Sequence, residues 1–503
     1  MIEGKVLSLS DGIALIDNMH CVGIHSTVLV GKSRIQGTVI AVNGDTATVH
    51  LFDNWQTVLV GDRVVSENIP LSVELGPGLI GQIFDALLRP IGCTDKSTGA
   101  LSRRRRWGFL PQKCFGDRVA AGDIIGYVSE TPSVRHAVTV RAGLCGTVVE
   151  LNNGYYCVTD RIGKIKKDDG TIVDLTLLQY RGLASYRAAP RTLSEYRSTS
   201  APLLCGLLAT DAFFPIEKGS VALIAGDTSA CASNMLARLT LSSTADVNVV
   251  VLCGKSLNVI YSRLGEYKAS SAYRNTVFIL SPQSDRYEMR IKSLETGFAV
   301  AEYFRDMGLD VLLSFDSLDA ILELEPANAS LVHLTGLLSR ATSVQMNGAC
   351  ASLTFAATVS HSLIASADQI KQKAWTYISL CNESQATAKF PVDIEDSFSK
   401  AFATDAAAKI ALVLTGLSRD TNAELAVLAQ NVAKALLNAD FFATRAKTEP
   451  DAQTFTSAEQ AFLDKVLSLC RDAEERTDDR INILRNILTL CNEINIRTKR
   501  KEK

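Results

Sequence analysis

The sequence lacks any run of about 18 apolar residues, so it contains no candidate for a transmembrane helix. It also lacks an N-terminal basic segment followed by an apolar stretch, and we expect no signal peptide. Its twelve cysteines are scattered and include no Cys-x-x-Cys pair, which argues against a zinc ribbon and, in a chain of 503 residues, against a disulfide scaffold. Together these absences predict a cytoplasmic protein with reduced thiols.

An excess of positive charge is missing as well. The chain has 52 Lys+Arg against 54 Asp+Glu, a formal net charge of −2, whereas a nucleic-acid-binding protein is normally basic. The local exception is the run from Arg103 to Arg106. Such a run is usually a solvated face, and an acidic or phosphate-bearing partner is the alternative. Apolar residues make up 47% of the chain and charged residues 21%, which indicates globular domains without a long disordered segment.

The first half of the chain has the character of β-structure. Residues 35–40 and 46–51 are β-branched runs around Asn43-Gly44-Asp45, and an Asn-Gly pair supplies the positive φ of a tight hairpin turn. Short strands at this spacing predict an N-terminal β-barrel over residues 1–70. Residues 71–100 are a Gly- and Pro-rich connector, and residues 101–195 are expected to be a β-rich insertion.

The second half changes period. Apolar runs at 221–224, 249–252, 277–280 and 311–313 alternate with helical stretches, which is typical of a parallel sheet covered on both faces. We therefore assign residues 196–380 to an α/β domain. From about residue 395 the chain is expected to be helical, and residues 381–503 are assigned to a helical domain. Its last apolar stripe contains Ile481, Leu484 and Cys491. The basic tail from Arg497 is expected to be frayed.

Several segments resemble the A subunit of V-type and archaeal A-type rotary ATPases, which is normally the catalytic subunit of that family. The clearest is residues 71–91, LSVELGPGLIGQIFDALLRPI. Residues 107–111 and 122–130 are similar to the bulge insertion of that subunit, and residues 201–204, 213–219 and 301–308 follow in the same order. The resemblance is collinear from residue 1 to about 400. It implies an N-terminal β-barrel, a β-rich bulge, a P-loop-NTPase-like (RecA-like) α/β core and a C-terminal helical domain.

The same resemblance locates the phosphate loop, which in this family reads Gly-x-x-x-x-Gly-Lys-Ser/Thr after the first core strand. Gly226 and Ser233 occupy the positions of the first glycine and of the hydroxyl. Cys231 and Ala232 replace the second glycine and the lysine, and Asp227 adds a carboxylate near the place of the phosphate. Loss of one charge-assisted contact removes about 1.5–3 kcal/mol. The sequence therefore predicts a degenerate phosphate loop.

The positions that supply the reaction itself are also altered. Lys255 occupies the position of the family's general-base glutamate, and a charged lysine cannot accept a proton. It could instead replace the missing lysine as a phosphate ligand. Arg290 is retained beside this site, and Asp316 matches the aspartate on the Mg²⁺ side, where Ser233 would be its partner. Alternatively, Gly226 and Ser233 belong to an ordinary strand-to-helix turn, and Asp316 is a helix cap or turn residue. No catalytic residue and no cofactor are assigned, although the family implies ATP or ADP with Mg²⁺.

These replacements favour a non-catalytic, structural A-type subunit of a V/A-type ATP synthase or ATPase. One alternative is a working alpha subunit, coupled to proton or sodium transport, with an atypical site. Another is a free-standing scaffold or regulator derived from that subunit. The resemblance implies B-type subunits of a hexameric ring and central-stalk subunits as partners, with no nucleic acid and no insertion into the membrane. The expected location is the cytoplasmic face of a membrane, in the peripheral sector. Whether this chain is itself an enzyme stays open at this point.

Overall fold

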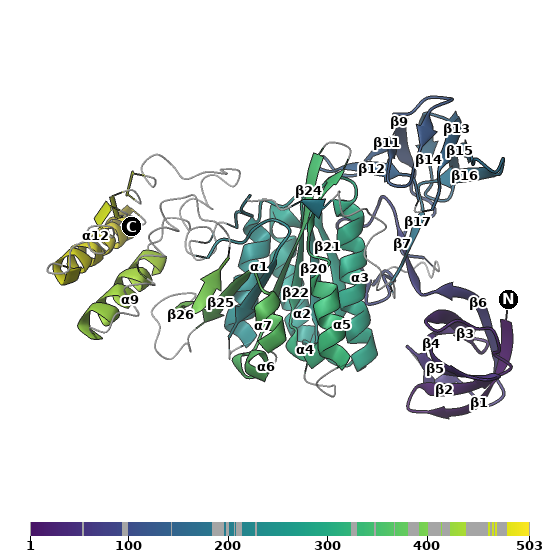
Figure 1. Cartoon of the computed structure of the whole chain (residues 1–503), viewed down its shortest axis with the longest axis horizontal. Helices are drawn as coiled ribbons and strands as arrows, with labels where there is room; N and C mark the ends of the chain where they lie inside the picture. The colour runs from purple at the N-terminus through teal and green to yellow at the C-terminus, as the bar shows by residue number, and fades with distance from the viewer. Residues whose placement is uncertain are drawn as a thin grey trace. The chain divides into compact units, whose positions relative to one another are not determined.

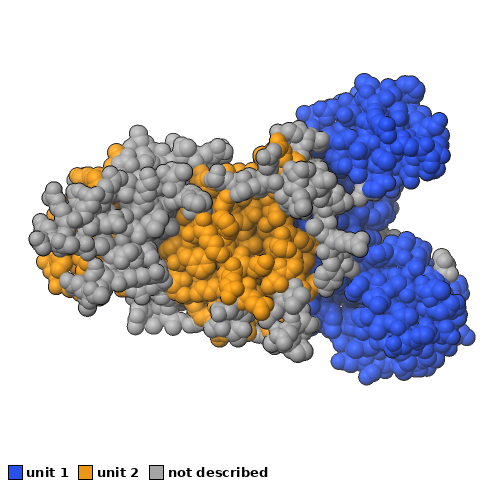
Figure 2. Space-filling model, viewed as in Figure 1, with its two compact units in different colours: residues 1–191, 253–257, 277–303 blue, residues 192–252, 258–276, 304–503 orange. Residues whose placement is uncertain are grey.

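A computed structural model divides the chain into two compact units, which Figure 2 shows in blue and orange. Unit 1 comprises residues 1–191, 253–257 and 277–303, and unit 2 comprises residues 192–252, 258–276 and 304–503. Asp227 and residue 213, which were singled out in the sequence, lie outside the described residues. The structure describes residues 2–52, 55–92, 99–141, 143–183, 196–197, 201–205, 207, 214–226, 229–322, 329–346, 349–366, 368–380, 392–400, 414, 423–438, 461–462, 465–466, 468–469 and 480–501.

Unit 1 begins with a closed six-stranded β-barrel, drawn in purple in Figure 1. Its strands are β1 (Ile2–Ser10), β2 (Ile13–Asp17), β3 (Ser26–Val30), β4 (Ile35–Asn43), β5 (Thr46–Leu51) and β6 (Arg63–Pro70), in the order β1-β2-β5-β4-β3-β6. Strand β6 pairs with β1 and closes the ring. Alternate residues of β3 are buried, because successive side chains of a strand point to opposite faces. A short 3-10 helix, η1 (Trp55–Thr57), precedes β6.

The hairpin between β4 and β5 confirms the turn predicted from the Asn-Gly pair. Asn43 and Thr46 are paired, so the two-residue loop consists of Gly44 and Asp45, and Asn43 is still part of the strand. Gly44 has φ of +60°, a conformation that glycine adopts without steric cost. The sequence therefore located the turn correctly and placed its first residue one position too early.

The connector contains two short strands, β7 (Ser72–Leu75) and β8 (Ile83–Asp85). Its Gly-Pro-Gly turn has a structural requirement for glycine, because Gly78 has φ of +113° and a Cβ there would lie 3.1 Å from the ring of Trp107. Strand β7 pairs with β17 (Gln179–Gly182), the last strand of the insertion. The connector and the end of the insertion thus form one two-stranded sheet.

The insertion consists of two four-stranded antiparallel sheets. One has the order β10-β13-β15-β16, and the other has the order β12-β11-β9-β14. Residues 152–153 connect β13 to β14, and residues 167–171 connect β15 to β16. The strands are β9 (Trp107–Pro111), β10 (Arg118–Val119), β11 (Ile124–Ser129), β12 (Arg135–Thr139), β13 (Gly146–Leu151), β14 (Gly154–Tyr156), β15 (Arg161–Lys166) and β16 (Ile172–Thr176).

Two elements from later in the sequence complete unit 1. Strand β21 (Thr276–Ser281) pairs in parallel with β8 of the connector, and the 19-residue helix α3 (Tyr287–Arg305) follows it. The hydroxyl of Thr296 donates a hydrogen bond of 2.6 Å to the carbonyl oxygen of Ala86 and ties α3 to the connector. The first turn of α3 carries Glu288 and its last turn carries Arg305, which matches the polarity of the helix dipole.

The sheet of unit 2 has the strand order β26-β25-β19-β24-β22-β20, and helices pack against it (Figure 1). Strands β25, β19, β24, β22 and β20 are parallel, and their predominantly apolar sequences agree with burial of both faces. These strands are β19 (Val221–Ala225), β20 (Val247–Cys253), β22 (Val311–Asp316), β24 (Ala349–Val359), β25 (Thr376–Leu380) and β26 (Val392–Ser399).

The remaining elements of unit 2 surround this sheet. Strand β18 (Tyr196–Arg197) pairs with β23 (Ser343–Met346), which in turn pairs with β24. The helices before the last sheet strand are α1 (Ser229–Ser242), α2 (Leu257–Lys268), η4 (Ser271–Asn275), α4 (Asp319–Leu322), α5 (Ala329–Leu338), α6 (His361–Ser366) and α7 (Asp368–Lys373).

The C-terminal part contains helices, as expected, with two corrections. Residues 392–399 form strand β26, antiparallel to β25, so the expectation of helix from about residue 395 was wrong for this segment. The tail is not frayed from Arg497, because α12 (Arg480–Lys501) continues to Lys501. Its apolar stripe joins that of α9 (Ala423–Asn438) in one hydrophobic cluster of unit 2.

Among the described helices, none combines the length and the hydropathy that a membrane span requires.

Candidate functional site

The predicted phosphate loop connects β19 to α1 in unit 2. All five residues of β19 are buried, and the backbone N–H of Gly226, the next residue, donates a hydrogen bond of 3.1 Å to the carbonyl oxygen of Val359 in β24. A Cβ at Gly226 would lie 3.4 Å from the methyl group of Ala232. The methyl group of Ala232 therefore lies next to the position that a side chain at Gly226 would occupy.

Cys231 and Ala232, which the sequence analysis assigned to the glycine and lysine positions of a phosphate loop, belong to the hydrophobic core. Cys231 is 5% exposed and Ala232 is 1% exposed, and both belong to the cluster that contains Ile224, Met235 and Leu380. A thiol and a methyl group suit such a cluster, because neither carries a charge that burial would penalise. The first turn of α1 is thus packed as an apolar surface.

Ser233 and Asp316 are brought together, as the sequence predicted for the two residues on the Mg²⁺ side. The hydroxyl of Ser233 donates a hydrogen bond of 2.7 Å to Oδ1 of Asp316. Thr358, at the end of β24, donates a second one of 2.8 Å to the same oxygen. All three side chains are buried. The carboxylate is therefore held by two hydroxyl donors, which compensates for part of its loss of hydration.

The sequence analysis missed Thr358, which follows Asp316 by 42 residues. Its parallel strand β24 lies between β19 and β22, so its carboxyl end falls next to both. A hydroxyl residue at the end of an apolar strand was the only available signal, and the strand order was needed to interpret it. Nearby, Thr240 and Ser314 form another hydroxyl pair, with their oxygens 2.6 Å apart.

The space around Ser233 and Asp316 is small. A cavity of about 10 Å³ lies beside them, lined also by Arg263 and Tyr267, and this volume holds about one water molecule. Burial raises the pKa of Tyr267 above its usual value, so this phenol is protonated at neutral pH. The guanidinium of Arg263 donates to Asn234 at 2.7 Å and pairs with Glu266 at 2.7 Å.

Lys255 and Arg290 belong to unit 1. Lys255 is partly buried, and its carbonyl oxygen accepts a hydrogen bond of 2.9 Å from the backbone N–H of Gln283. The guanidinium of Arg290 donates to the carbonyl oxygens of Asp285, at 3.2 Å, and Gln283, at 2.7 Å. Both residues therefore fix the loop that leads into α3. Their part in binding phosphate stays a prediction.

The residues after Asp316 form hydrogen bonds that connect β22 to α6. Ser317 donates to Asp319 at 2.9 Å, and Asp319 accepts a hydrogen bond of 2.8 Å from the backbone N–H of Ser360 before α6. Asp319 thus joins β22 to the start of α6. Within the residues that the structure describes, no group of three or more His, Cys, Asp or Glu side chains could hold a metal ion.

Position 232 carries a methyl group, the hydroxyl of Ser233 donates to the carboxylate of Asp316, and the adjoining cavity has the volume of about one water molecule. The described residues of the site thus hold the carboxylate of Asp316 between the hydroxyl groups of Ser233 and Thr358.

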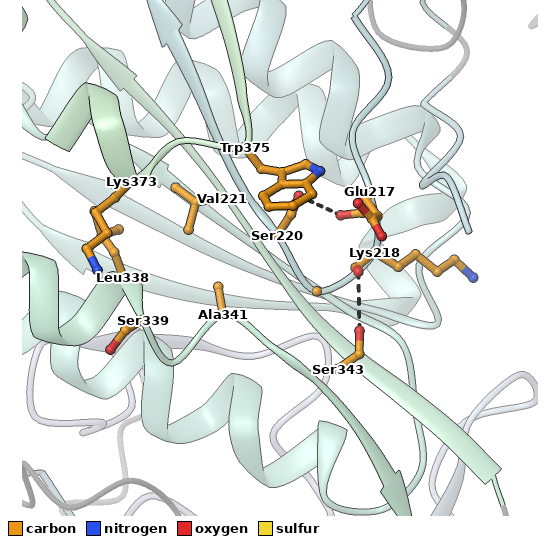
Figure 3. Close-up of a pocket in the computed structure, with 11 residues that line it drawn as sticks. Glu217, Lys218, Ser220, Val221, Leu338, Ser339, Ala341, Ser343, Lys373 and Trp375 are labelled. Carbon is orange, nitrogen blue, oxygen red and sulfur yellow. Dashed lines mark hydrogen bonds between the residues drawn. The ribbon is translucent and has the colours of Figure 1, made fainter. Parts of the chain in front are cut away.

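A larger cavity, of about 270 Å³, lies at the opposite, amino end of β19. Figure 3 shows Lys373 and Leu338 on one side of it and Trp375 with Glu217 on the other. Burial raises the pKa of Glu217, which the indole of Trp375 partly offsets by donating a hydrogen bond to it. The side chain of Lys218 points away from the cavity and pairs with Asp310 at 2.6 Å. No sequence motif indicated this cavity.

The basic run of the sequence analysis is for the most part exposed in the structure. Arg104 and Arg106 are exposed, and the guanidinium of Arg105, also exposed, lies 3.8 Å from the centre of the Trp107 ring. Arg103 is partly buried and pairs with Glu74 at 2.6 Å. The interpretation as a solvated face therefore fits three of the four arginines.

Comparison with known proteins gives two family matches. Residues 206–325 match the nucleotide-binding domain of the ATP synthase alpha/beta family, and residues 98–181 match the barrel-sandwich domain of ATP synthase alpha/beta subunits. The N-terminal barrel, the central α/β domain and the helical elements agree with this architecture.

Individual relatives are V-type ATP synthase alpha chains. The chain is 34% identical over 331 residues to V-type ATP synthase alpha chain 1 of Clostridium tetani, covering 62% of this chain and 55% of the relative. It is 32% identical over 334 residues to the alpha chain of Acetivibrio thermocellus, covering 63% and 56%, and 31% identical over 335 residues to that of Streptococcus pyogenes, also covering 63% and 56%. The chain therefore spans about half the length of these relatives and is homologous to them over that part.

Proposed function

We propose that this chain is a non-catalytic, structural counterpart of the V/A-type ATP synthase alpha (A) subunit. The homology to V-type ATP synthase alpha chains supports the subunit type. The observation that carries the non-catalytic role is Ala232, whose buried methyl group lies against Gly226 at the position of the phosphate-binding lysine. Lys255, at the position of the general base, supports the same proposal, because a charged lysine cannot accept a proton from the attacking water.

The partners of such a subunit are B-type subunits of a hexameric ring and the subunits of a central stalk. We place the chain in the peripheral sector of that complex, on the cytoplasmic face of the membrane, without a nucleic-acid partner and without insertion of its own into the bilayer. In this role the barrel, the insertion and the helical part would provide subunit contacts. Co-purification of the chain with a B-type subunit would support assembly into a ring.

The test is equilibrium binding of Mg-ATP to the purified chain by calorimetry. We expect no binding up to millimolar ATP. The Cys231→Gly/Ala232→Lys double variant is the comparison, because it restores the glycine and the ammonium that a phosphate loop uses. Its folding is checked by circular dichroism before titration. Binding of Mg-ATP to the natural chain in the micromolar range, about −8 kcal/mol, would contradict the proposal.

A working alpha subunit with an atypical site is the second candidate. The Ser233–Asp316 pair favours it, since these two residues are the ones that would hold Mg²⁺ in this family. Under this alternative Lys255 would bind phosphate in place of the missing lysine. This alternative makes two demands. The chain must bind Mg-ATP with an affinity that Lys255→Gln abolishes, and a ring with this chain as its only A-type subunit must turn over ATP. Turnover that Asp316→Asn abolishes would establish this alternative.

A free-standing scaffold or regulator is the third candidate. Like the structural subunit proposed first, such a protein would not bind nucleotide. Unlike that subunit, it would not assemble into a ring. A chain that remains monomeric when it is co-expressed with a B-type subunit would support this third reading.

A further inference from the structure

Helix α3 is bonded at its two ends to two different parts of unit 1. Its last turns contact the β-rich insertion, and the residues at its first turn contact the N-terminal barrel. The whole helix is 19 residues long, about 28 Å at the usual rise per residue. We call the first set of contacts the insertion joint and the second the barrel joint.

The insertion joint is buried. Nε2 of His136 in β12 lies 2.9 Å from the hydroxyl of Tyr303, and its Nδ1 lies 2.7 Å from a carboxylate oxygen of Glu130. Arg181 of β17 pairs at 2.6 Å with Glu302, the neighbour of Tyr303. Glu130, His136, Glu302 and Tyr303 are each less than 9% exposed. Water and salt therefore have little access to these bonds.

The same glutamate joins the connector to the insertion. The backbone N–H groups of Gly78 and Ile80 donate to Oε1 of Glu130, at 2.6 and 3.4 Å. Trp107 packs over this turn, since a Cβ at Gly78 would lie 3.1 Å from its ring. Trp107 is buried and therefore reports on the packing beside the insertion joint.

The barrel joint has a different character. Arg286, which precedes α3, donates to the carbonyl oxygen of Asp11 at 2.6 Å and lies 3.3 Å from its carboxylate. Glu288 pairs with His50 at 3.2 Å. The Asp11 side chain is 85% exposed and that of Arg286 is 28% exposed, whereas the His50 side chain that faces Glu288 is 8% exposed. The guanidinium of Arg286 also lies 5.8 Å from the centre of the partly exposed Trp55 ring. Salt screens the Arg286–Asp11 pair, because the Asp11 carboxylate is in contact with water.

We propose that α3 connects the insertion and the barrel through one permanent and one reversible attachment: the insertion joint stays closed while the barrel joint opens and closes. The barrel would then be able to change its attachment to α3, while the insertion and the helix move as one body. This inference concerns unit 1 alone and does not depend on the proposed function, because neither joint includes a residue of the phosphate loop.

Two of the chain's three tryptophans allow each joint to be followed separately. A Trp107→Phe/Trp375→Phe variant leaves Trp55 as the reporter of the barrel joint, and a Trp55→Phe/Trp375→Phe variant leaves Trp107 as the reporter of the insertion joint. Acrylamide quenching is measured from about 0.05 to 1 M NaCl, a range over which screening of exposed charges increases strongly. Because acrylamide is neutral, salt does not change its encounters with the protein.

We expect the quenching constant of Trp55 to rise about two-fold across the salt range, while that of Trp107 stays constant. In the Trp55 reporter, Arg286→Gln should give the high quenching constant already at low salt and abolish its salt dependence. Arg286→Lys, a milder change, should move the rise of the Trp55 quenching constant to a lower salt concentration. Arg118→Gln is the matched control, since it removes an exposed ion pair with Asp168 in the insertion and should leave the response of Trp55 unchanged.

Two results would overturn the proposal. A quenching constant of Trp55 that depends neither on salt nor on Arg286 would show that the barrel joint does not open. A rise in the quenching constants of both Trp55 and Trp107 over the same salt range would show that both ends of α3 release together, so that the two joints do not differ.

Discussion

At the scale of single residues, the candidate site is a small polar cluster in an apolar surrounding. Asp316 accepts from both Ser233 and Thr358 through one oxygen, and all three residues are buried. A buried carboxylate is stable only when donors replace its lost water. The two hydroxyl groups supply these donors, so the cluster has a structural reason to persist without nucleotide.

Asp316→Asn should destabilise the fold by about 1–3 kcal/mol, because the hydrogen bonds that Ser233 and Thr358 donate would then go to a neutral amide oxygen instead of a carboxylate, and bonds to a charged group are the stronger ones. Urea denaturation followed by circular dichroism measures this loss. Asp168→Asn, at an exposed ion pair of the insertion, is the control and should change the free energy of unfolding by less than about 0.5 kcal/mol. If Mg²⁺ stabilised the natural chain and not the Asp316→Asn variant, this carboxylate would be a metal ligand after all.

Glu130 should make stability depend on pH. Burial alone would raise its pKa, but the hydrogen bond and charge of His136 and the N–H groups of Gly78 and Ile80 outweigh it and lower the pKa below the usual 4.5. A group with a lowered folded-state pKa stabilises the fold above its unfolded pKa, and this stabilisation is lost as the pH falls through the folded-state value.

The variant Glu130→Gln cannot titrate, so it tests this expectation. The difference in free energy of unfolding between the natural chain and Glu130→Gln should be largest above about pH 5 and should shrink on acidification. Chemical denaturation at a series of pH values between about 7 and 3.5 measures the difference. A difference that stays constant over this range would mean that Glu130 does not carry the pH dependence.

Single residues also show the limits of prediction from sequence. The sequence located Gly226 and Asp316 at the correct strand ends and Ser233 after the first of them, and a parallel sheet brings those ends together. It could not show that Cys231 and Ala232 are core residues, since burial depends on what packs against them. Thr358 was missed because the order of the strands is a long-range property that one sequence does not display.

At the scale of elements, the first turn of α1 has become part of the hydrophobic core of unit 2. Ala232→Lys alone should therefore destabilise the fold, by about 1–3 kcal/mol from overpacking and by more if the ammonium stays buried. Thermal unfolding measures the effect. Asn258→Lys, on the exposed face of α2, adds the same side chain and should leave the melting temperature within about 2 °C of the natural chain.

Prediction of the elements depended on how local their signals are. The β4–β5 hairpin is determined by a turn residue with positive φ, and the parallel strands by runs of apolar residues, so both were predicted correctly. Strand β26 was missed, because its sequence, VDIEDSFS, alternates with charges at the edge of the sheet and has no continuous apolar run. The length of α12 was underestimated, since a run of basic residues at the C-terminal end is compatible with a helix dipole as well as with fraying.

At the scale of the whole molecule, the free cysteines report which parts are accessible. Cys21, Cys114, Cys145 and Cys350 are exposed, whereas Cys205, Cys231, Cys253 and Cys491 are buried. Alkylation with mass-spectrometric mapping should label the exposed group first. Cys491 should be among the slowest, because burial raises its pKa to about 12 and the reactive species is the thiolate. Labelling of Cys231 in the folded chain would contradict its place in the core.

The division of unit 1 into three separate segments has a consequence for how the chain is made. Residues 1–191 leave the ribosome first, whereas the segment 277–303 that completes the unit begins 86 residues after Arg191. At synthesis rates of about 5–20 residues per second, Tyr303 is added roughly 6–24 s after Arg181. The bonds of His136 to Tyr303 and of Arg181 to Glu302 therefore form only after that interval, so the insertion completes its buried contacts with α3 late in synthesis.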